Sequence, residues 1–395
     1  MLRSLFSGIS GLRAHQTMLD VTGNNIANVN TVGFKSSSTQ FQDTLSQVLS
    51  NAGAPQAGVG GTNPAQVGLG VRVAGVTTNF AQGAAQLTNN STDMMISGDG
   101  FFTVSKGGQE YYTRAGAFSR DATGQLVTAD GALVQGWSAV NGVIDTNAPL
   151  TDLRVTNAAT MAAKATTTAS FEGNLPSDAT TGTSLDKQIT VYDSLGNAQQ
   201  LDLNFTKGGS GWSVLASFPS SPATTPVGSA LTFDASGVLT SPAGPLTIGG
   251  IAVDLSTITG MAGLDTVQSK NQNGQQAGTL QSFTLNADGT LQGAFSNGMK
   301  QTIGQIALAT FNNPVGLEKA GGSMYRTTVN SGAAQVGTAG SGGRGTLVGG
   351  SLEMSNVDLS AEFTNLIVAQ RGFQANARVI TTSDQVLQEL VDLKR

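Results

Sequence analysis

Residues 359–391 read LSAEFTNLIVAQRGFQANARVITTSDQVLQELV and carry a single apolar stripe. Along the stripe the steps alternate between four and three residues, and eight of its ten positions are apolar. An average step of about 3.5 residues keeps one face of a helix turned toward a partner helix. We therefore predict a C-terminal helix with a pairing seam. The stripe consists of Leu359, Phe363, Leu366, Gln370, Phe373, Ala377, Ile380, Asp384, Leu387 and Val391.

The N-terminal end of the chain carries a similar stripe, with six of eight positions apolar. Gly8, Gly11 and Gly23 lie in the same segment, and each costs about 1 kcal/mol relative to Ala in a helix interior. We expect this helix to be weak alone and to depend on a partner. The stripe consists of Leu2, Leu5, Ile9, Leu12, Gln16, Leu19, Gly23 and Ile26.

Either stripe taken alone is also compatible with an amphipathic helix that lies on its own domain. The narrowness of both stripes and their position at opposite termini favour pairing between helices. Ser355, followed three residues later by Asp358, resembles a capping box that starts the C-terminal helix. The predicted assembly seam comprises Leu5, Ile9, Leu12, Leu19, Ile26, Leu359, Phe363, Leu366, Phe373, Ile380, Leu387 and Val391.

Between the two ends the apolar pattern changes to a period of two. Short alternating runs separated by Gly- and Asp-rich turns predict β meanders at 94–137, 189–218 and 283–311. The predicted fold class is multidomain α+β, with terminal helices that form a coiled-coil-type assembly domain around nested, mainly β domains. The expected domains are 1–30 with 357–395 (helical assembly), 31–75 (extended connector), 76–145 with 281–356 (discontinuous β domain) and 146–280 (inserted outer β domain).

Composition excludes several classes of function. Only 11% of the 395 residues are charged, the formal net charge is -5, and no basic run is present, which argues against nucleic-acid binding. The absence of Cys removes disulfides, Cys-ligated metals and cysteine nucleophiles. His15 is the one histidine, so we predict no catalytic, cofactor or metal site. No apolar run approaches the roughly 20 residues that span a bilayer, and the first residues lack the apolar core of a Sec-type signal peptide.

Two local patterns have simpler explanations than a ligand site. Residues 340–345 match G-x-G-x-x-G, but they follow a loop of small residues and open no evident helix, so we predict a flexible linker. Several carboxylates could be interpreted as glycosidase pairs or calcium ligands. Each lies near a glycine, where turn geometry already explains it. These carboxylates are Asp99, Asp121, Asp130, Asp193 and Asp288.

Three stretches resemble the flagellar rod and hook family of axial proteins. Residues 23–28 read GNNIAN and 33–35 read GFK, similar to the N-terminal signature of that family. Residues 355–360 (SNVDLS) and 369–376 (AQRGFQAN) resemble its C-terminal signature, and residues 98–102 and 113–118 resemble its central part. The signature residues are Asn24, Asn25, Asn28, Gly33, Phe34, Lys35, Asn356, Asp358, Gln370 and Arg371.

The resemblance implies a structural subunit without cofactor, exported through the flagellar type III apparatus and found in the hook and basal body outside the cell. It further implies a helical homopolymer, a flexible curved tube that transmits torque from rod to filament. Rod, hook-cap and hook-filament junction proteins would be its partners. Chain length and the stretch at 161–170 favour a hook subunit. A distal-rod or hook-associated protein, a secreted β-rich adhesin and a secreted enzyme are the alternatives.

Overall fold

The computed structural model describes residues 2–55, 58, 60–156, 159–218, 221–226 and 230–392. Two compact units divide the chain. The first comprises residues 1–155, 284–292 and 302–395, and the second comprises residues 156–283 and 293–301. A helix at each end and many strands between them confirm the α+β class.

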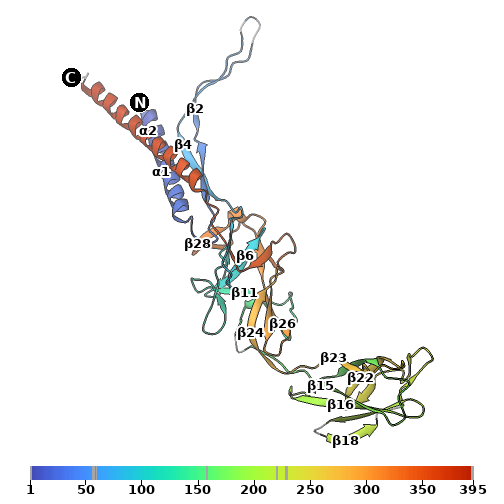
Figure 1. Cartoon of the computed structure of the whole chain (residues 1–395). Coiled ribbons are helices and arrows are strands. Elements are labelled where there is room, and N and C mark those ends of the chain that lie inside the picture. Colours follow the sequence, from blue (N-terminus) through green and yellow to red (C-terminus); the bar gives the residue numbers. More distant parts are fainter. Residues whose placement is uncertain are drawn as a thin grey trace. The chain divides into compact units, whose positions relative to one another are not determined.

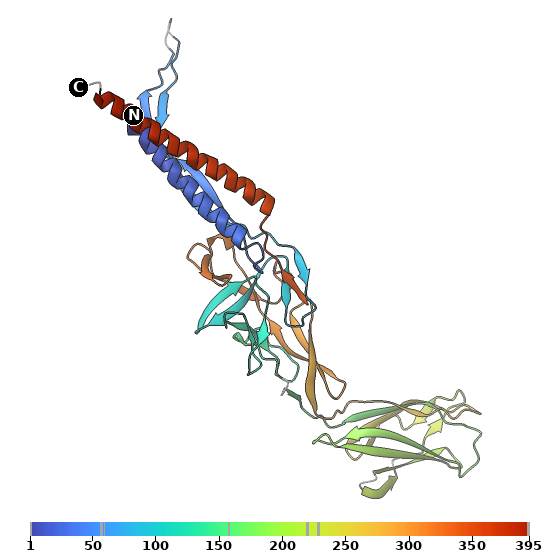
Figure 2. The same cartoon turned by 60° about the vertical axis from the view of Figure 1, so that its left-hand side comes forward.

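The two helices, α1 (Leu2–Ala27) and α2 (Leu359–Asp392), lie antiparallel and side by side in the first unit (Figures 1 and 2). Small residues bring the backbones close together. A Cβ added to Gly8 would lie 3.4 Å from Ile380 Cγ1, and one added to Gly372 would lie 2.5 Å from the His15 ring. Glycines that weaken an isolated helix thus allow this close pairing.

The start of α2 differs from the predicted capping box. The Oδ1 atom of Asp358 accepts hydrogen bonds from the backbone N–H groups of Ser360, at 2.8 Å, and Ala361, at 3.3 Å. Asp358 is therefore the N-cap, and the prediction that Ser355 starts the helix was wrong. Ser355 lies before the helix, where its hydroxyl accepts a bond from Val357 N–H at 3.4 Å. An Asp one residue before the first helical position satisfies the free N–H groups directly.

The segment 31–75, predicted as an extended connector, contains paired strands. β1 (Ser37–Asp43) pairs antiparallel with β4 (Val71–Thr78), and β2 (Ser46–Ser50) pairs with β3 (Ala65–Gly68). The sequence did not predict the β2–β3 pair because its strands are short and are joined by a Gly/Ala/Pro-rich stretch. Backbone pairing there does not require the bulky side chains that usually signal a strand.

The first unit also holds a β domain built from both halves of the sequence. Its main sheet has the order β26-β11-β7-β8-β29-β28. β6 pairs with β31 and β5 with β32, so strands near residue 90 meet strands near residue 350. The strands are β5 (Ala85–Leu87), β6 (Met94–Ser97), β7 (Phe101–Lys106), β8 (Gln109–Thr113), β9 (Ser119–Arg120), β10 (Leu126–Val127), β11 (Leu133–Ser138), β12 (Thr151–Asp152), β26 (Lys300–Ile306), β27 (Leu308–Thr310), β28 (Glu318–Gly321), β29 (Met324–Arg326), β30 (Gln335–Gly337), β31 (Thr346–Gly349) and β32 (Ser351–Glu353). A short 3-10 helix, η1 (Pro314–Gly316), precedes β28.

The second unit has two four-stranded sheets, β15-β16-β17-β18 and β21-β22-β14-β23, with β14 and β22 parallel. Phe171, Phe205 and Trp212 are fully buried in its core. The unit begins at Thr156 and not at residue 146, because β12 pairs with β11 of the first unit. Its strands are β13 (Thr160–Met161), β14 (Thr168–Asn174), β15 (Ser184–Tyr192), β16 (Ala198–Lys207), β17 (Trp212–Phe218), β18 (Ser221–Pro226), β19 (Thr232–Phe233), β20 (Leu239–Ser241), β21 (Leu246–Ile248), β22 (Ile251–Thr259) and β23 (Gln268–Gln272), with β24 (Gly278–Leu285) and β25 (Thr290–Phe295) shared between the units.

Candidate functional site: the helix pair and its anchor

The inner face of α1 is made of small residues. Gly8, Gly11, Ala14 and Thr22 are buried, and on α2 the fully buried residue is Ala369. Because these residues have small side chains or none, the backbones of α1 and α2 can approach each other closely. Ile380 of the predicted stripe packs against Gly8, where an added Cβ would lie 3.4 Å from its Cγ1.

The predicted seam residues fall into two groups. The first group is half-buried and consists of Leu5, Ile9, Leu12, Leu19, Ile26, Leu366, Phe373, Ile380 and Leu387. The others are exposed, with 39% of Leu359, 52% of Phe363 and 68% of Val391 accessible. Exposed apolar residues of α2 that the stripe missed are Ile367, Val368, Val379, Val386 and Leu390. Three of these exposed residues, Phe363, Ile367 and Val368, lie close together near the start of the helix and are named the outer face of α2.

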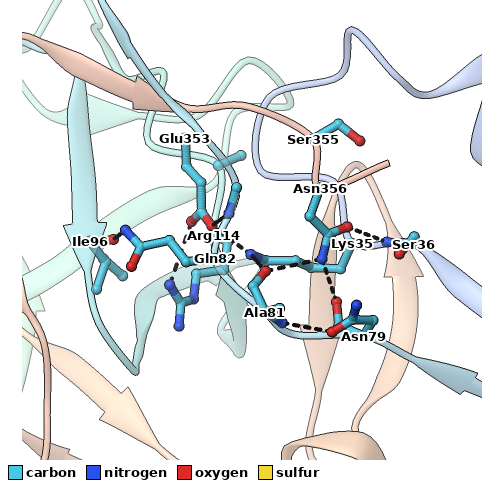
Figure 3. A network of polar contacts seen from close by, with 12 residues as sticks. Lys35, Ser36, Asn79, Ala81, Gln82, Ile96, Arg114, Glu353, Ser355 and Asn356 are labelled. Atoms are coloured by element: carbon cyan, nitrogen blue, oxygen red, sulfur yellow. Dashed lines mark hydrogen bonds and ion pairs between the residues drawn. The ribbon is translucent and has the colours of Figure 1, made fainter. Parts of the chain in front are cut away.

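A buried ion cluster anchors the segments that lead into and out of the helices (Figure 3). Lys35 Nζ lies 2.5 Å from Glu353 Oε1, and both side chains are fully buried. Arg114 Nη1 lies 3.5 Å from the other oxygen of Glu353. Lys35 also donates to the Ala81 carbonyl at 2.8 Å. Burial lowers the pKa of Lys35, although the Glu353 carboxylate opposes this shift, and burial lowers the pKa of Arg114 in the same way.

Asn356 joins the same segments through its carboxamide (Figure 3). Its Oδ1 accepts a bond from Ser36 N–H at 2.8 Å, and its Nδ2 donates to the carbonyls of Asn79, at 2.8 Å, and Ala81, at 3.0 Å. Gly33 packs next to this network with φ +67, and an added Cβ would lie 2.5 Å from Ala115 N. Only glycine fits at this position without displacing backbone.

Asn25 connects both helices to β1. Its Nδ2 donates to the Ser37 carbonyl at 2.7 Å and to Glu362 Oε1 of α2 at 2.9 Å, while its Oδ1 accepts from Ser37 N–H at 3.0 Å. All three bonds hold a side chain that is 1% exposed. The first turn of α2 is thus fixed to the last turns of α1.

The remaining residues of the family signature make few contacts within the chain or are exposed to solvent. Asn28 donates to the Asn24 carbonyl at 2.9 Å and closes the end of α1, whereas the Asn24 side chain is exposed. The Lys319 ammonium lies 5.2 Å from the centre of the Phe34 ring. Gln370 and Arg371 are exposed on α2.

Sequence reasoning missed Glu353 and Glu362, the acids on which the network depends. Nothing in the pattern singles them out, because each is an ordinary Glu near the start of α2. Arg114 lies in the stretch 113–118, which resembles the family. This resemblance was the signal that could have identified Arg114. Pairing with Lys35 could not be deduced from the sequence, since the three residues are far apart along the chain.

His15 and residues 340–345, which the sequence analysis considered as possible ligand or catalytic sites, make packing and turn contacts. His15 packs against Gly372 and, at 5.8 Å between ring centres, against Phe41. Residues 340–345 form a closed turn in which Gly340 N–H donates to the Gly345 carbonyl at 2.9 Å, so the predicted flexible linker was wrong. Within the described ranges there is no group of three or more metal-binding side chains. None of the described helices is both long and apolar enough to cross a membrane.

Comparison with known proteins places the chain in a family. Residues 95–204 match the flagellar hook protein FlgE/F/G D1 domain, and residues 152–312 match the flagellar basal body protein FlaE D2 domain. Residues 5–35 match the flagella basal body rod protein family, and residues 348–393 match the flagellar basal body rod FlgEFG protein C-terminal family. The flagellar hook protein FlgE of Borreliella burgdorferi is 40% identical over 442 residues, which cover all of both chains. The chain belongs to the flagellar hook protein family.

Other comparisons agree with membership of the hook protein family. The flagellar basal-body rod protein FlgG of Bacillus subtilis is 34% identical over 396 residues and is also covered completely. The crystal structure of Helicobacter pylori flagellar hook protein FlgE2 has a similar fold, with a TM-score of 0.51 and 15% identity over 66% of this chain and 98% of that chain. Hook proteins are structural components of the flagellum and not enzymes.

Proposed function

We propose that the chain polymerises into the hook through its terminal helices, which form an inner layer of coiled-coil type, while the β domains lie outside. The observation that carries this proposal is the outer face of α2, where 52% of Phe363, 57% of Ile367 and 54% of Val368 are exposed. Contiguous apolar surface of this kind usually marks an interaction site. In a homopolymer the surface that covers it belongs to another copy.

The predicted seam keeps a role in this proposal. Small residues of α1 are used within the chain, so Leu5, Ile9, Leu12, Leu19 and Ile26 remain half-buried beside the contact. A third helix, from another copy of the chain, can pack against the surface that these side chains form. The seam therefore serves contacts between copies more than the contact inside one chain.

We assign the inner layer to residues 1–30 and 357–395, the adjoining β domain to 76–155, 284–292 and 302–356, and the outer domain to 156–283 and 293–301. The resulting tube is flexible and curved, and it transmits torque from rod to filament. Its partners are the rod, the hook cap, the hook-filament junction proteins and the flagellar type III export apparatus. The low charge of the chain suits β surfaces that slide over one another, because few ion pairs fix a single arrangement.

Substitution of Phe363 by Asp tests the proposal. The change places a carboxylate in the contact between copies, where it would be buried without a partner. Tubes should be lost in sedimentation and negative-stain microscopy, while the β-sheet circular dichroism of the monomer stays unchanged. Ser210→Asp, at an exposed turn position outside both helices, is the control and should still form tubes. Normal tubes from Phe363→Asp would refute the assignment of the inner layer.

A distal-rod protein is the second candidate, favoured by the full-length similarity to a rod protein. The shape of the polymer separates the two functions. A hook subunit gives curved, flexible tubes, whereas a rod subunit gives straight, stiff ones. Microscopy of the wild-type polymer decides between them.

A further inference from the structure

The two ends of the helix pair present different surfaces. Gly8 lies opposite Ile380, and each step toward the start of α1 is a step toward the end of α2. By this register α1 begins, at Leu2, opposite Val386. The last turns of α2 extend beyond α1, as both views of the pair show (Figures 1 and 2). These residues, 387–392, are named the α2 overhang.

The α2 overhang carries apolar side chains and two carboxylates. Its sequence is LQELVD, and the chain continues with Leu393, Lys394 and Arg395. Leu390 is 49% exposed and Val391 is 68% exposed, and both Glu389 and Asp392 are exposed. An apolar helix end that projects past its partner helix has nothing within the described chain to cover it.

A cleft lies along the other half of α1, between that helix, the β1–β4 ribbon and the segment 315–319. It has a volume of about 430 Å³. Val76 and Val315 line it and are each 49% exposed. Lys319 and, on α1, Asp20 are the charged side chains of its lining. This site is named the Lys319 cleft.

Lys319 has no acidic partner in its own chain. Its ammonium donates to Ser37 Oγ at 2.8 Å and lies against the Phe34 ring. Among the described residues no carboxylate lies within ion-pair distance of it, since neighbouring Glu318 pairs with Arg326 instead. Partial burial lowers the pKa of Lys319, as expected for a cation held without a counter-ion.

We propose that the α2 overhang of one copy docks into the Lys319 cleft of a second copy, with Glu389 or Asp392 facing Lys319. The inference rests on the proposed assembly through terminal helices and specifies one contact of it. Apolar side chains of the overhang meet the apolar lining of the cleft, and a carboxylate of the overhang meets Lys319. Because the two surfaces lie toward opposite ends of the helix pair, the contact is heterologous and repeats from copy to copy, which generates an open helical polymer.

Charge exchange tests the contact. Lys319→Glu should raise the concentration needed for polymerisation at least about tenfold, and so should the double change Glu389→Lys with Asp392→Lys. Combining all three should restore polymerisation. Lys106→Glu and Asp145→Lys, at exposed positions outside both surfaces and both helices, are the controls and should polymerise as wild type does. Circular dichroism of each monomer shows that the variants fold.

Cysteine crosslinking gives a second, independent measurement, because the chain has no native Cys. Chains with Val315→Cys and chains with Val391→Cys, copolymerised and mildly oxidised, should form a disulfide-linked dimer only in the polymer. The inference is overturned if the Lys319→Glu variant polymerises as wild type does. It is also overturned if the combined variant does not recover and no crosslink forms. Either result leaves the proposed function intact. A wild-type chain that forms no polymer at all overturns both.

Discussion

Replacement of Glu353 by Gln should be among the most destabilising changes at a single position. Its carboxylate is fully buried between Lys35 and Arg114, and it also accepts a bond from Gly83 N–H at 2.8 Å. Gln keeps the shape but removes the charge, so two buried cations lose their counter-ion. Removing one partner of a buried ion pair costs about 3–5 kcal/mol. A domain is stable by only about 5–15 kcal/mol, so the loss is a large share of the total.

Urea unfolding of the monomer, followed by circular dichroism, measures this loss. Glu318→Gln is the matched control, because Glu318 pairs with Arg326 at the surface and should contribute nothing measurable. Adding Lys35→Met to Glu353→Gln should recover part of the lost stability, because Arg114 is then the one member of the cluster that still lacks its counter-ion. Equal stabilities of Glu353→Gln and Glu318→Gln would refute the reasoning.

Two further predictions follow from close packing and from a turn. Gly23→Ala should stabilise the chain by about 1 kcal/mol, because no atom lies within 4 Å of the added Cβ. Gly33→Ala should cost about 1–3 kcal/mol, because φ is +67 and the added Cβ would lie 2.5 Å from the backbone N of Ala115; urea unfolding compares the two variants. Hydrogen bonds from Asn197, first from its side chain and then from its backbone, lower the pKa of Asp193. The ionised carboxylate therefore stabilises the folded chain fully above the ordinary pKa of 3.8, and this stabilisation is lost as the pH falls through the lowered pKa. Wild type and Asp193→Ala should therefore converge in thermal stability at acid pH, and a constant difference would contradict this.

The sequence predicted both helices and the strands of the three meanders, because their apolar periods are strong and local, but it did not predict β1–β5, β14, β22 or β28–β32. Trp212–Phe218 was predicted as a strand and is β17. The cap of α2 was misassigned because Ser355 and Asp358 are both good N-cap residues, and only the backbone distinguishes them. Pairing of β2 with β3 was missed because their side chains are small, polar or isolated among loop residues.

The candidate site was predicted in part. Apolar stripes located both helices, yet the contact between them uses Gly8, Gly11 and Ala369, which a search for large apolar residues ignores. Lys35 was identified only through its family signature. Its partners come from distant positions, and no local pattern encodes a contact between residues 35 and 353. Long-range polar networks of this kind are determined by the whole fold.

Hydrogen exchange in monomer and polymer tests the central claim, assembly through the terminal helices, most directly. We predict that the backbone amides of α1 and α2 exchange much more slowly in the polymer, with the largest change around the outer face of α2 at Phe363, Ile367 and Val368. Strands β16 and β17 of the second unit should change far less. Equal exchange of both helices in monomer and polymer, with slowing confined to the β strands, would contradict the account.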